Sequence, residues 1–176
     1  MTTIIAQKNN KGVTMIADSQ ATDGDGSIWK TATKVVKNGH YLIGGAGDCT
    51  ALDIATFIWK PPYSVAASKD VNRYMITTVI PSLRKALKDN EYSKDDKDPD
   101  SGFKIILVLR NEIFVTDDYW SVNQPVGNVA SIGSGSAYAL GALSAGASLQ
   151  KAMEIAEYHD GNTGRPFITI NQEKSE

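Results

Sequence analysis

The pair Asn38-Gly39 is the sequence feature that most restricts how this chain can fold. It lies between two short β-rich runs, Lys34 to Lys37 and His40 to Ile43. Asn-Gly readily adopts the positive φ angles of a type I′ turn, which joins two antiparallel strands through two residues. The sequence therefore predicts a β-hairpin here, and an antiparallel sheet that includes it.

Further β-rich runs predict more strands on both sides of this hairpin. Two of them pair across the polar turn Lys8 to Gly12, and two others pair across Arg110-Asn111. The predicted strands are Thr3 to Gln7, Val13 to Ala17, Phe103 to Leu109, Glu112 to Thr116, Val129 to Ile132 and Phe167 to Ile170.

Helical patterns separate these groups of strands. Thr50 to Trp59 is predicted to be a helix that ends at Pro61-Pro62, because proline cannot continue helical hydrogen bonding. Apolar residues recur at helical spacing over Lys69 to Lys88, and two more helices are predicted over Ala137 to Ala145 and Leu149 to Tyr158. This order of strands and helix pairs predicts an α+β fold in which two antiparallel sheets are sandwiched between helical layers.

The size and composition fit one globular domain over residues 1–176. The chain has 176 residues, 41% of them hydrophobic, and a formal charge of -2. A domain of this size can bury a substantial core. The polar tract from Asn90 to Gly102 is predicted to be a solvated loop within the domain.

Several classes of site and partner are not expected. The single cysteine, Cys49, offers neither an internal disulfide nor a thiolate cluster, and we expect no metal and no cofactor. Scattered basic residues argue against nucleic-acid binding. The N-terminus resembles neither a signal peptide nor a membrane span, so we expect a cytoplasmic protein with no membrane association.

Four short motifs carry the candidate chemistry, and the first is Met1-Thr2. Met1 is normally removed before threonine, which would leave Thr2 with both a hydroxyl and a free α-amine. An N-terminal amine can serve as the base for such a hydroxyl nucleophile. Alone, Met-Thr is merely a common start.

The other motifs also have ordinary structural interpretations. Asp18 ends a predicted strand and could simply cap a turn, and Lys34 could be a solvated charge on an edge strand. The run Gly44 to Asp48 could be a tight strand-to-helix connection that needs positive φ. Alternatively, it could present a backbone N–H at a helix start to bind an oxyanion.

Together and in this order, the motifs resemble those of the proteasome β-subunit and HslV family over nearly the whole chain. The resemblance extends from Thr2 through Ala17 to Thr22, Lys34 and Ala46-Gly47 to the later Gly133-Ser134-Gly135. The run Tyr158 to Gly164 is similar to the segment that supports the active threonine in proteasomes. The resemblance implies a four-layer αββα fold and a threonine-type endopeptidase.

The resemblance also implies a role for each matching residue. Thr2 would be the nucleophile, Lys34 would tune it, Asp18 would orient Lys34, and the Gly47 N–H would bind the oxyanion. A supporting shell would consist of Ser134, Asp160 and Thr163. Substrate would bind by strand addition along Ala21-Thr22 and Gly45 to Gly47, with Ala21, Ala32 and Gly45 lining a roomy pocket for an apolar side chain.

Ordinary pKa values identify the general base. An α-amine titrates near ~7.7–8.0 and lysine near ~10.4, so at neutral pH the lysine is ~300-fold less often uncharged. We therefore expect the Thr2 amine to be the base. Lys34 should remain an ammonium ion beside Asp18.

The resemblance further implies assembly into a homo-oligomeric double ring, with hexameric or heptameric rings, and an ATP-dependent unfoldase as a possible partner that delivers protein substrates. Two alternatives stay open. One is a catalytically silent ring or scaffold subunit that retains Met1, and the other is a different amidohydrolase with an N-terminal nucleophile.

Overall fold

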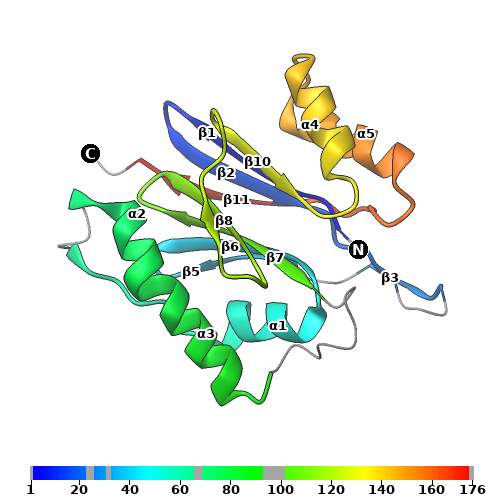
Figure 1. Cartoon of the computed structure of the whole chain (residues 1–176). Helices are drawn as coiled ribbons and strands as arrows, with labels where there is room; N and C mark the ends of the chain where they lie inside the picture. Colours follow the sequence, from blue (N-terminus) through cyan, green and yellow to red (C-terminus); the bar gives the residue numbers. More distant parts are fainter. Residues whose placement is uncertain (1, 23–25, 31–32, 66–68, 93–101, 175–176) are drawn as a thin grey trace.

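Two antiparallel sheets form the centre of the molecule in the computed structural model, which describes residues 2–22, 26–30, 33–65, 69–92 and 102–174. The first has the strand order β10-β1-β2-β11, and the second has the order β5-β6-β7-β8-β9 (Figure 1). The first sheet consists of β1 (Ile4–Asn9), β2 (Gly12–Ala17), β10 (Val129–Ile132) and β11 (Ile168–Glu173). The second consists of β5 (Val35–Asn38), β6 (Tyr41–Gly47), β7 (Phe103–Leu109), β8 (Glu112–Asp117) and β9 (Val122–Asn123).

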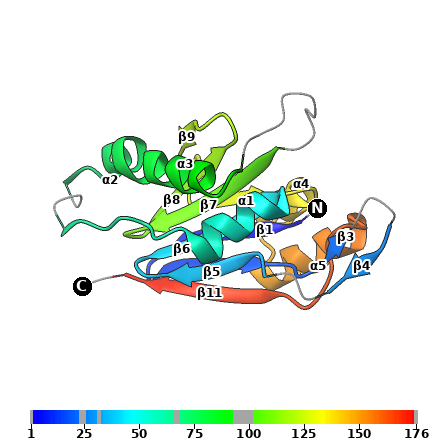
Figure 2. The same ribbon diagram turned by 90° about the horizontal axis from the view of Figure 1, so that it is seen from below.

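Helices cover the outer face of each sheet, so the molecule has four layers (Figure 2). On the five-stranded sheet lie α1 (Cys49–Asp53), η1 (Ile54–Ile58), α2 (Val71–Tyr74), η3 (Met75–Val79) and α3 (Ile80–Asp89). On the four-stranded sheet lie α4 (Ser136–Ser144) and α5 (Leu149–His159). A short separate pair, β3 (Ala21–Thr22) with β4 (Ile28–Trp29), extends beyond both sheets.

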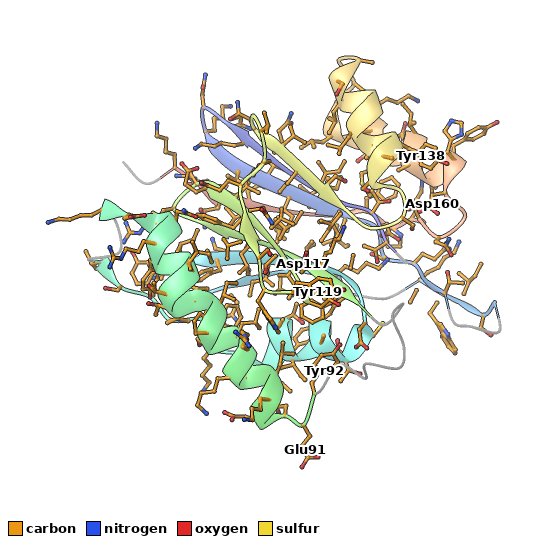
Figure 3. The ribbon with its side chains drawn as sticks, viewed as in Figure 1. Glu91, Tyr92, Asp117, Tyr119, Tyr138 and Asp160 are labelled. Atoms are coloured by element: carbon orange, nitrogen blue, oxygen red, sulfur yellow. The ribbon has the colours of Figure 1, made fainter. Side chains whose placement is uncertain are left out.

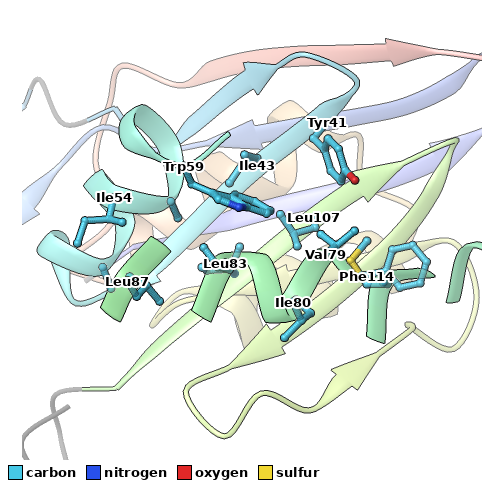
Figure 4. Packing of buried hydrophobic residues seen from close by; sticks show 14 of the residues in the cluster. Tyr41, Ile43, Ile54, Trp59, Val79, Ile80, Leu83, Leu87, Leu107 and Phe114 are labelled. Carbon is cyan, nitrogen blue, oxygen red and sulfur yellow. The ribbon is translucent and has the colours of Figure 1, made fainter. Parts of the chain in front are cut away.

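Three apolar clusters hold the four layers together. Strand β1 shows the principle, because Ile4 and Ala6 point into the cluster between the sheets whereas Ile5 points into the cluster under α4 and α5. A strand buried on both faces cannot alternate apolar with polar residues, and β1 begins as a continuous apolar run. The largest cluster lies between the five-stranded sheet and its helices, where Leu83 and Trp59 pack against Ile43 and Leu107 (Figure 4).

The predicted hairpins are present, with one difference in turn type. Asn38 pairs with Tyr41, so the two central turn residues are Gly39 and His40 rather than Asn38 and Gly39. Of these two only Gly39 has positive φ, 58°, a pattern typical of a type II′ turn with glycine first. The predicted turn was therefore wrong in type, and its central residues lie one position later than predicted.

The β7–β8 hairpin has the type I′ pattern instead. Its central residues Arg110 and Asn111 have φ of 52° and 62°. Positive φ at both central positions matches the right-handed twist of the flanking strands. The predicted turn across these two residues is confirmed.

The helix predicted over Lys69 to Lys88 begins later and widens in the middle. Asp70 caps it by accepting a hydrogen bond from the Arg73 N–H, at 2.8 Å. Within it, Pro81 cannot donate to the carbonyl of Thr77, and the wider π-helical turn η3 ends two residues before this proline. The helix predicted over Thr50 to Trp59 corresponds to α1 and η1.

The glycine run is not a turn: Gly44, Gly45 and Gly47 belong to β6 and pair with β7, and among them only Gly47 has positive φ. Of the loop predicted over 90–102, residues 93–101 lie outside the described residues. None of the helices described here has the length and apolar character to cross a membrane.

Candidate active site

One end of the four-stranded sheet gathers segments that are far apart in the sequence. The register pairs Ile4 with both Ala17 and Ile132, and pairs Ala17 with Ile168, so β1 and β11 begin where β2 and β10 end. The chain segments just beyond these strand ends therefore meet. They are Thr2-Thr3, Asp18 to Gln20, Gly133-Ser134 and Thr163-Gly164.

Asp18 is the most buried charged group at this end, with no exposed surface. Its Oδ1 accepts the Thr3 N–H at 2.9 Å, and its Oδ2 accepts the N–H groups of Gln20 at 3.1 Å and Gly164 at 3.2 Å. Three backbone donors thus hold the carboxylate in one orientation. These hydrogen bonds and one cation replace the water that the buried carboxylate has lost.

Lys34 supplies that cation. It directly precedes β5, only 7% of it is exposed, and its Nζ lies 2.9 Å and 3.0 Å from the two carboxylate oxygens of Asp18. The ammonium also donates to the carbonyl of Gln20. The interpretation of Lys34 as a solvated edge charge is therefore wrong.

Burial has the largest effect on the protonation of this lysine. It lowers the pKa of Lys34 below the ordinary lysine value, and the charge and hydrogen bonds of Asp18 oppose this shift. Asp18 favours the ammonium form as predicted, but the loss of water outweighs it. Burial in this site therefore makes the positive charge of Lys34 costly, and Asp18 offsets part of that cost.

A second network contains the hydroxyl groups. Asp160 caps the C-terminal end of α5, at the same end of the molecule (Figure 3). Its Oδ2 accepts hydrogen bonds from the hydroxyls of Ser134 at 2.6 Å and Thr163 at 2.7 Å. The hydroxyls of Thr163 and Thr3 lie 2.6 Å apart. Because Thr163 gives its only hydrogen to Asp160, Thr3 is the donor to Thr163.

The same reasoning fixes the hydrogen of Ser134. Its short bond to the carboxylate uses the hydroxyl hydrogen, so the Ser134 oxygen faces Thr2 as an acceptor. The nitrogen of Thr2 lies 3.4 Å from that oxygen. In the full sequence this nitrogen is the amide that follows Met1, and after removal of Met1 the same atom would be the α-amine.

The hydroxyl network also acts on Asp160. Burial raises the pKa of this carboxyl, but hydrogen bonds from Ser134, Thr163 and Asn162 lower it, and they prevail, so the pKa is below the ordinary aspartate value. Asp160 is therefore ionised at neutral pH and remains an acceptor. This keeps both hydroxyl hydrogens directed at it.

Gly133 lets the chain approach Thr2 closely. Its φ is 97°, and a Cβ at this position would lie 2.0 Å from the carbonyl oxygen of Thr2. Any side chain here would displace Thr2 from Ser134. In the Gly133-Ser134-Gly135 motif, Gly133 thus allows close approach to Thr2, and Ser134 supplies a hydroxyl group.

Gly47 presents a backbone N–H on the same side as Lys34. The N–H of Gly45 donates to the carbonyl of Lys34 at 3.0 Å, and alternate residues of a strand direct their N–H groups to the same edge. The Gly47 N–H therefore points toward that edge, beyond the start of β5. Glycine is required here because φ is 109° and because a Cβ on this residue would lie 2.3 Å from the Gly102 carbonyl oxygen.

A pocket of about 340 Å³ lies in front of these groups. Thr2, Lys34 and Gly47 line one part of it, and α1 with η1 forms the opposite wall. The remaining lining residues are Ala21, Thr22, Thr33, Cys49, Leu52, Asp53 and Phe57. A nucleophile candidate, a buried cation and a backbone N–H therefore share one open cavity.

The predicted substrate-binding residues are placed unequally. Ala21 and Thr22 line the pocket, and Ala32 lies outside the described residues. Gly45 faces Leu52 instead of open space, since a Cβ on it would lie 2.0 Å from Leu52 Cδ2. The role predicted for these four residues stays a prediction.

Known proteins resemble this chain in sequence and in fold. No protein-family model matches the chain. Its sequence is 29% identical over 146 residues to the ATP-dependent protease subunit HslV of Desulfovibrio desulfuricans, a match that covers 82% of this chain and 77% of that protein. The chain is thus similar in sequence to a threonine peptidase subunit of the HslV family.

Solved structures show the same fold over nearly the full length. The Thiobacillus denitrificans BPH structure in complex with epoxomicin superposes with a TM-score of 0.77 at 20% identity, covering 99% of this chain and 100% of that chain. HslV from Trypanosoma brucei superposes with a TM-score of 0.65 at 20% identity, covering 97% and 99%. The predicted α+β fold with antiparallel sheets and helical layers is confirmed.

Sequence reasoning missed several contributors to this site. Thr3 links both networks, through its N–H to Asp18 and its hydroxyl to Thr163. Gln20 and Gly164 hold the Asp18 carboxylate through backbone groups. Backbone donors leave no signature in side-chain identity, whereas Thr3 could have been noticed as a threonine at the start of an otherwise apolar strand.

Proposed function

We propose that this chain is a threonine-type endopeptidase subunit that cleaves peptide bonds through an acyl-enzyme on Thr2. The observation that carries the proposal is the buried Asp18–Lys34 ion pair, whose lysine lines the same pocket as Thr2 and Gly47. Ion pairs in such positions are costly unless they serve a structural or chemical purpose. Removal of Met1 is part of the proposal.

Acylation begins at the Thr2 hydroxyl. The α-amine of Thr2 accepts the hydroxyl proton while the oxygen attacks the carbonyl carbon of the substrate, and the carbonyl electrons move to its oxygen. The Gly47 N–H donates to that oxyanion, and the Lys34 ammonium stabilises developing negative charge nearby. The amine then returns the proton to the departing nitrogen, which leaves an ester on Thr2 and a new peptide amine.

Deacylation repeats the proton transfer with water. The amine accepts a proton from water, whose oxygen attacks the ester carbon, and the proton returns to the Thr2 oxygen as the ester bond breaks. Ser134 supports both steps because its oxygen accepts an N–H of the amine. The lone pair of the amine is thus left for the Thr2 hydroxyl.

The family also guides proposals about assembly. We propose that copies of the chain form a double ring with hexameric or heptameric rings, that the complex works in the cytoplasm, and that an ATP-dependent unfoldase supplies protein substrates. The name of the Desulfovibrio relative, a subunit of an ATP-dependent protease, supports this proposal. The ring number is directly measurable by negative-stain imaging of the purified complex.

Two measurements test the peptidase proposal together. Intact-mass analysis of the chain purified from its native host should show the loss of Met1, and the assembled protein should hydrolyse unstructured peptides. Epoxomicin, which is bound in the BPH structure, should occupy the same pocket and block that hydrolysis. A chain that retains Met1 in its host would instead support the silent-subunit alternative, because its Thr2 nitrogen would be an amide without basicity.

A further inference from the structure

The side chain of Gln20 is buried beside the candidate active site and has no role in the proposed chemistry. Only 6% of the residue is exposed. Its Nε2 donates to the carbonyl of Gly161 at 2.8 Å and to the hydroxyl of Thr22 at 3.4 Å, which uses both amide hydrogens. The reverse orientation of the amide would set two oxygen acceptors 2.8 Å apart, so the Gly161 carbonyl determines which end of the amide faces it.

The Gly161 carbonyl belongs to the turn that carries Asp160. This turn follows α5, and the Thr163 N–H closes it by donating to the Asp160 carbonyl at 2.9 Å. A Cβ on Gly161 would meet no residue other than its chain neighbours within 4 Å, in the part of the chain that the structure describes. Because side-chain packing does not hold the turn at Gly161, the hydrogen bond from Gln20 is what attaches it to the segment that follows β2.

Gly164 leaves the space in which the Gln20 amide lies. A Cβ on Gly164 would lie 2.2 Å from the Oε1 of Gln20 and 3.1 Å from its Cβ. The backbone of Gly164 pairs with the same segment, because its N–H donates to Asp18 and its carbonyl accepts the Ser19 N–H. The far end of the turn is thus attached through backbone groups, whereas Gly161 is attached through the Gln20 side chain.

The position of this turn matters because Asp160 orients the Ser134 hydroxyl. Ser134 donates to the Asp160 carboxylate at 2.6 Å, and its oxygen lies 3.4 Å from the nitrogen of Thr2. A displacement of the turn by about 1 Å would lengthen the Ser134–Asp160 contact beyond hydrogen-bond distance. Gln20 also holds the hydroxyl of Thr22, which lines the pocket in front of Thr2, so one side chain fixes the turn relative to the pocket.

We propose that Gln20 is a positioning residue of this peptidase, because it keeps the Ser134 oxygen aligned with the α-amine of Thr2. It acts through the Gly161 carbonyl and the Asp160 turn, and it does not line the pocket itself. The inference rests on the proposed function, since only a chain without its initiator methionine has that amine.

The test replaces Gln20 with methionine, which has a similar length and shape but donates no hydrogen bond. Gln20→Met should lower kcat for an unstructured peptide ~10-fold and leave KM within about twofold, because the loss falls on alignment of the amine and not on substrate binding. Gln172→Met is the matched control. This glutamine also donates to a backbone carbonyl, that of His40 at 2.7 Å, but it lies near the other end of β11, so its loss should leave kcat unchanged.

A double variant distinguishes positioning from a general loss of stability. If Gln20 acts through Asp160, the combination of Gln20→Met with Asp160→Asn should be no slower than Asp160→Asn alone, because the second change removes the group that the first displaces. Independent losses of kcat that multiply in the double variant would overturn the inference. Equal kcat for Gln20→Met and wild type would also overturn it.

Hydrogen exchange separates this inference from the proposed function. The N–H groups of Asn162 and Thr163 should exchange faster in Gln20→Met than in wild type or Gln172→Met, whether or not peptide is cleaved. If a chain that has lost Met1 cleaves no peptide, the proposed function fails, and faster exchange would still show that Gln20 holds the turn. If peptide is cleaved and exchange is unchanged in Gln20→Met, the peptidase stands and the role of Gln20 is refuted.

Discussion

The two polar networks beside Thr2 are built in different ways. The Asp18 network is an ion pair buried among backbone N–H groups, and it places a fixed positive charge near Thr2. The Asp160 network is a chain of hydroxyl groups that ends on one carboxylate, and it determines which way each hydrogen points. One network therefore supplies a positive charge, and the other orients hydroxyl hydrogens. Substitutions in the two networks should have different effects on stability and activity.

Loss of the charge network should have the largest effect on stability. Asp18→Asn leaves the Lys34 ammonium buried without its partner, and breaking a buried ion pair in this way costs roughly 3–5 kcal/mol. Denaturant unfolding of the variant should show a loss of this size, together with loss of peptide hydrolysis.

Lys8→Met provides the comparison for Asp18→Asn. It breaks the Lys8–Glu112 pair, whose side chains are 35% and 40% exposed, and should cost at most about 1 kcal/mol because such pairs are screened by water. Similar losses in both variants would contradict the claim that burial makes the Asp18–Lys34 pair special.

Loss of the carboxylate in the hydroxyl network should come next. Asp160→Asn replaces a charged acceptor of two short hydrogen bonds with a neutral amide, and hydrogen bonds to charged groups contribute about 1.5–3 kcal/mol. The variant should fold, since α5 remains packed through Ala152, Met153 and Ala156.

Activity measurements on Asp160→Asn distinguish whether Asp160 orients the Ser134 hydroxyl or only shapes the pocket. An amide can turn its NH₂ group toward Ser134, which would force that hydroxyl to donate elsewhere. We expect kcat to fall by about 10- to 100-fold, in the range of general-base effects, while KM changes little. A rise in KM with unchanged kcat would show that Asp160 only shapes the pocket.

The depressed pKa of Asp160 predicts how its contribution depends on pH. Because the folded-state pKa is below the unfolded value, the stability it contributes is fully present above the unfolded pKa of about 3.9 and is lost as pH falls through the folded pKa. The difference in unfolding free energy between wild type and Asp160→Asn should be constant near neutrality and shrink below about pH 4. A difference that grows on acidification would reverse the assigned sign.

The smallest effect should come from the residue that joins the networks. Thr3→Val removes the hydroxyl that donates to Thr163 but keeps the shape and the N–H bond to Asp18. A buried neutral hydrogen bond contributes about 1 kcal/mol, so unfolding free energy should fall by that amount. Thr14→Val, which removes an exposed bond to Asn171, should stay within about 0.5 kcal/mol, and an equal loss in both would deny Thr3 a linking role.

The contrast between the networks also explains how much the sequence could predict. Strands and helices were predictable because periodicity and turn residues act locally, as in the hairpin around Gly39. Resemblance identified Asp18, Lys34, Ser134 and Asp160 by their side chains, and the structure brings all four to one end of the sandwich.

The remaining features of the site depend on strand register and on burial, and no short sequence motif encodes either. The backbone donors of Gln20 and Gly164 reach Asp18 only because β2 pairs with β11 in a particular register. Burial of Lys34 depends on both sheets being in place, so its lowered pKa could not be anticipated from a neighbouring carboxylate alone.

The most direct test of the central claim is mass spectrometry of the chain quenched in acid during peptide turnover. We expect a fraction of the N-terminal fragment to carry the acyl portion of the substrate as an ester on Thr2, with Met1 absent. Thr2→Ala should carry no such group and should not hydrolyse peptide. Turnover by Thr2→Ala, or an acyl group found on another residue, would contradict the role of Thr2 as nucleophile.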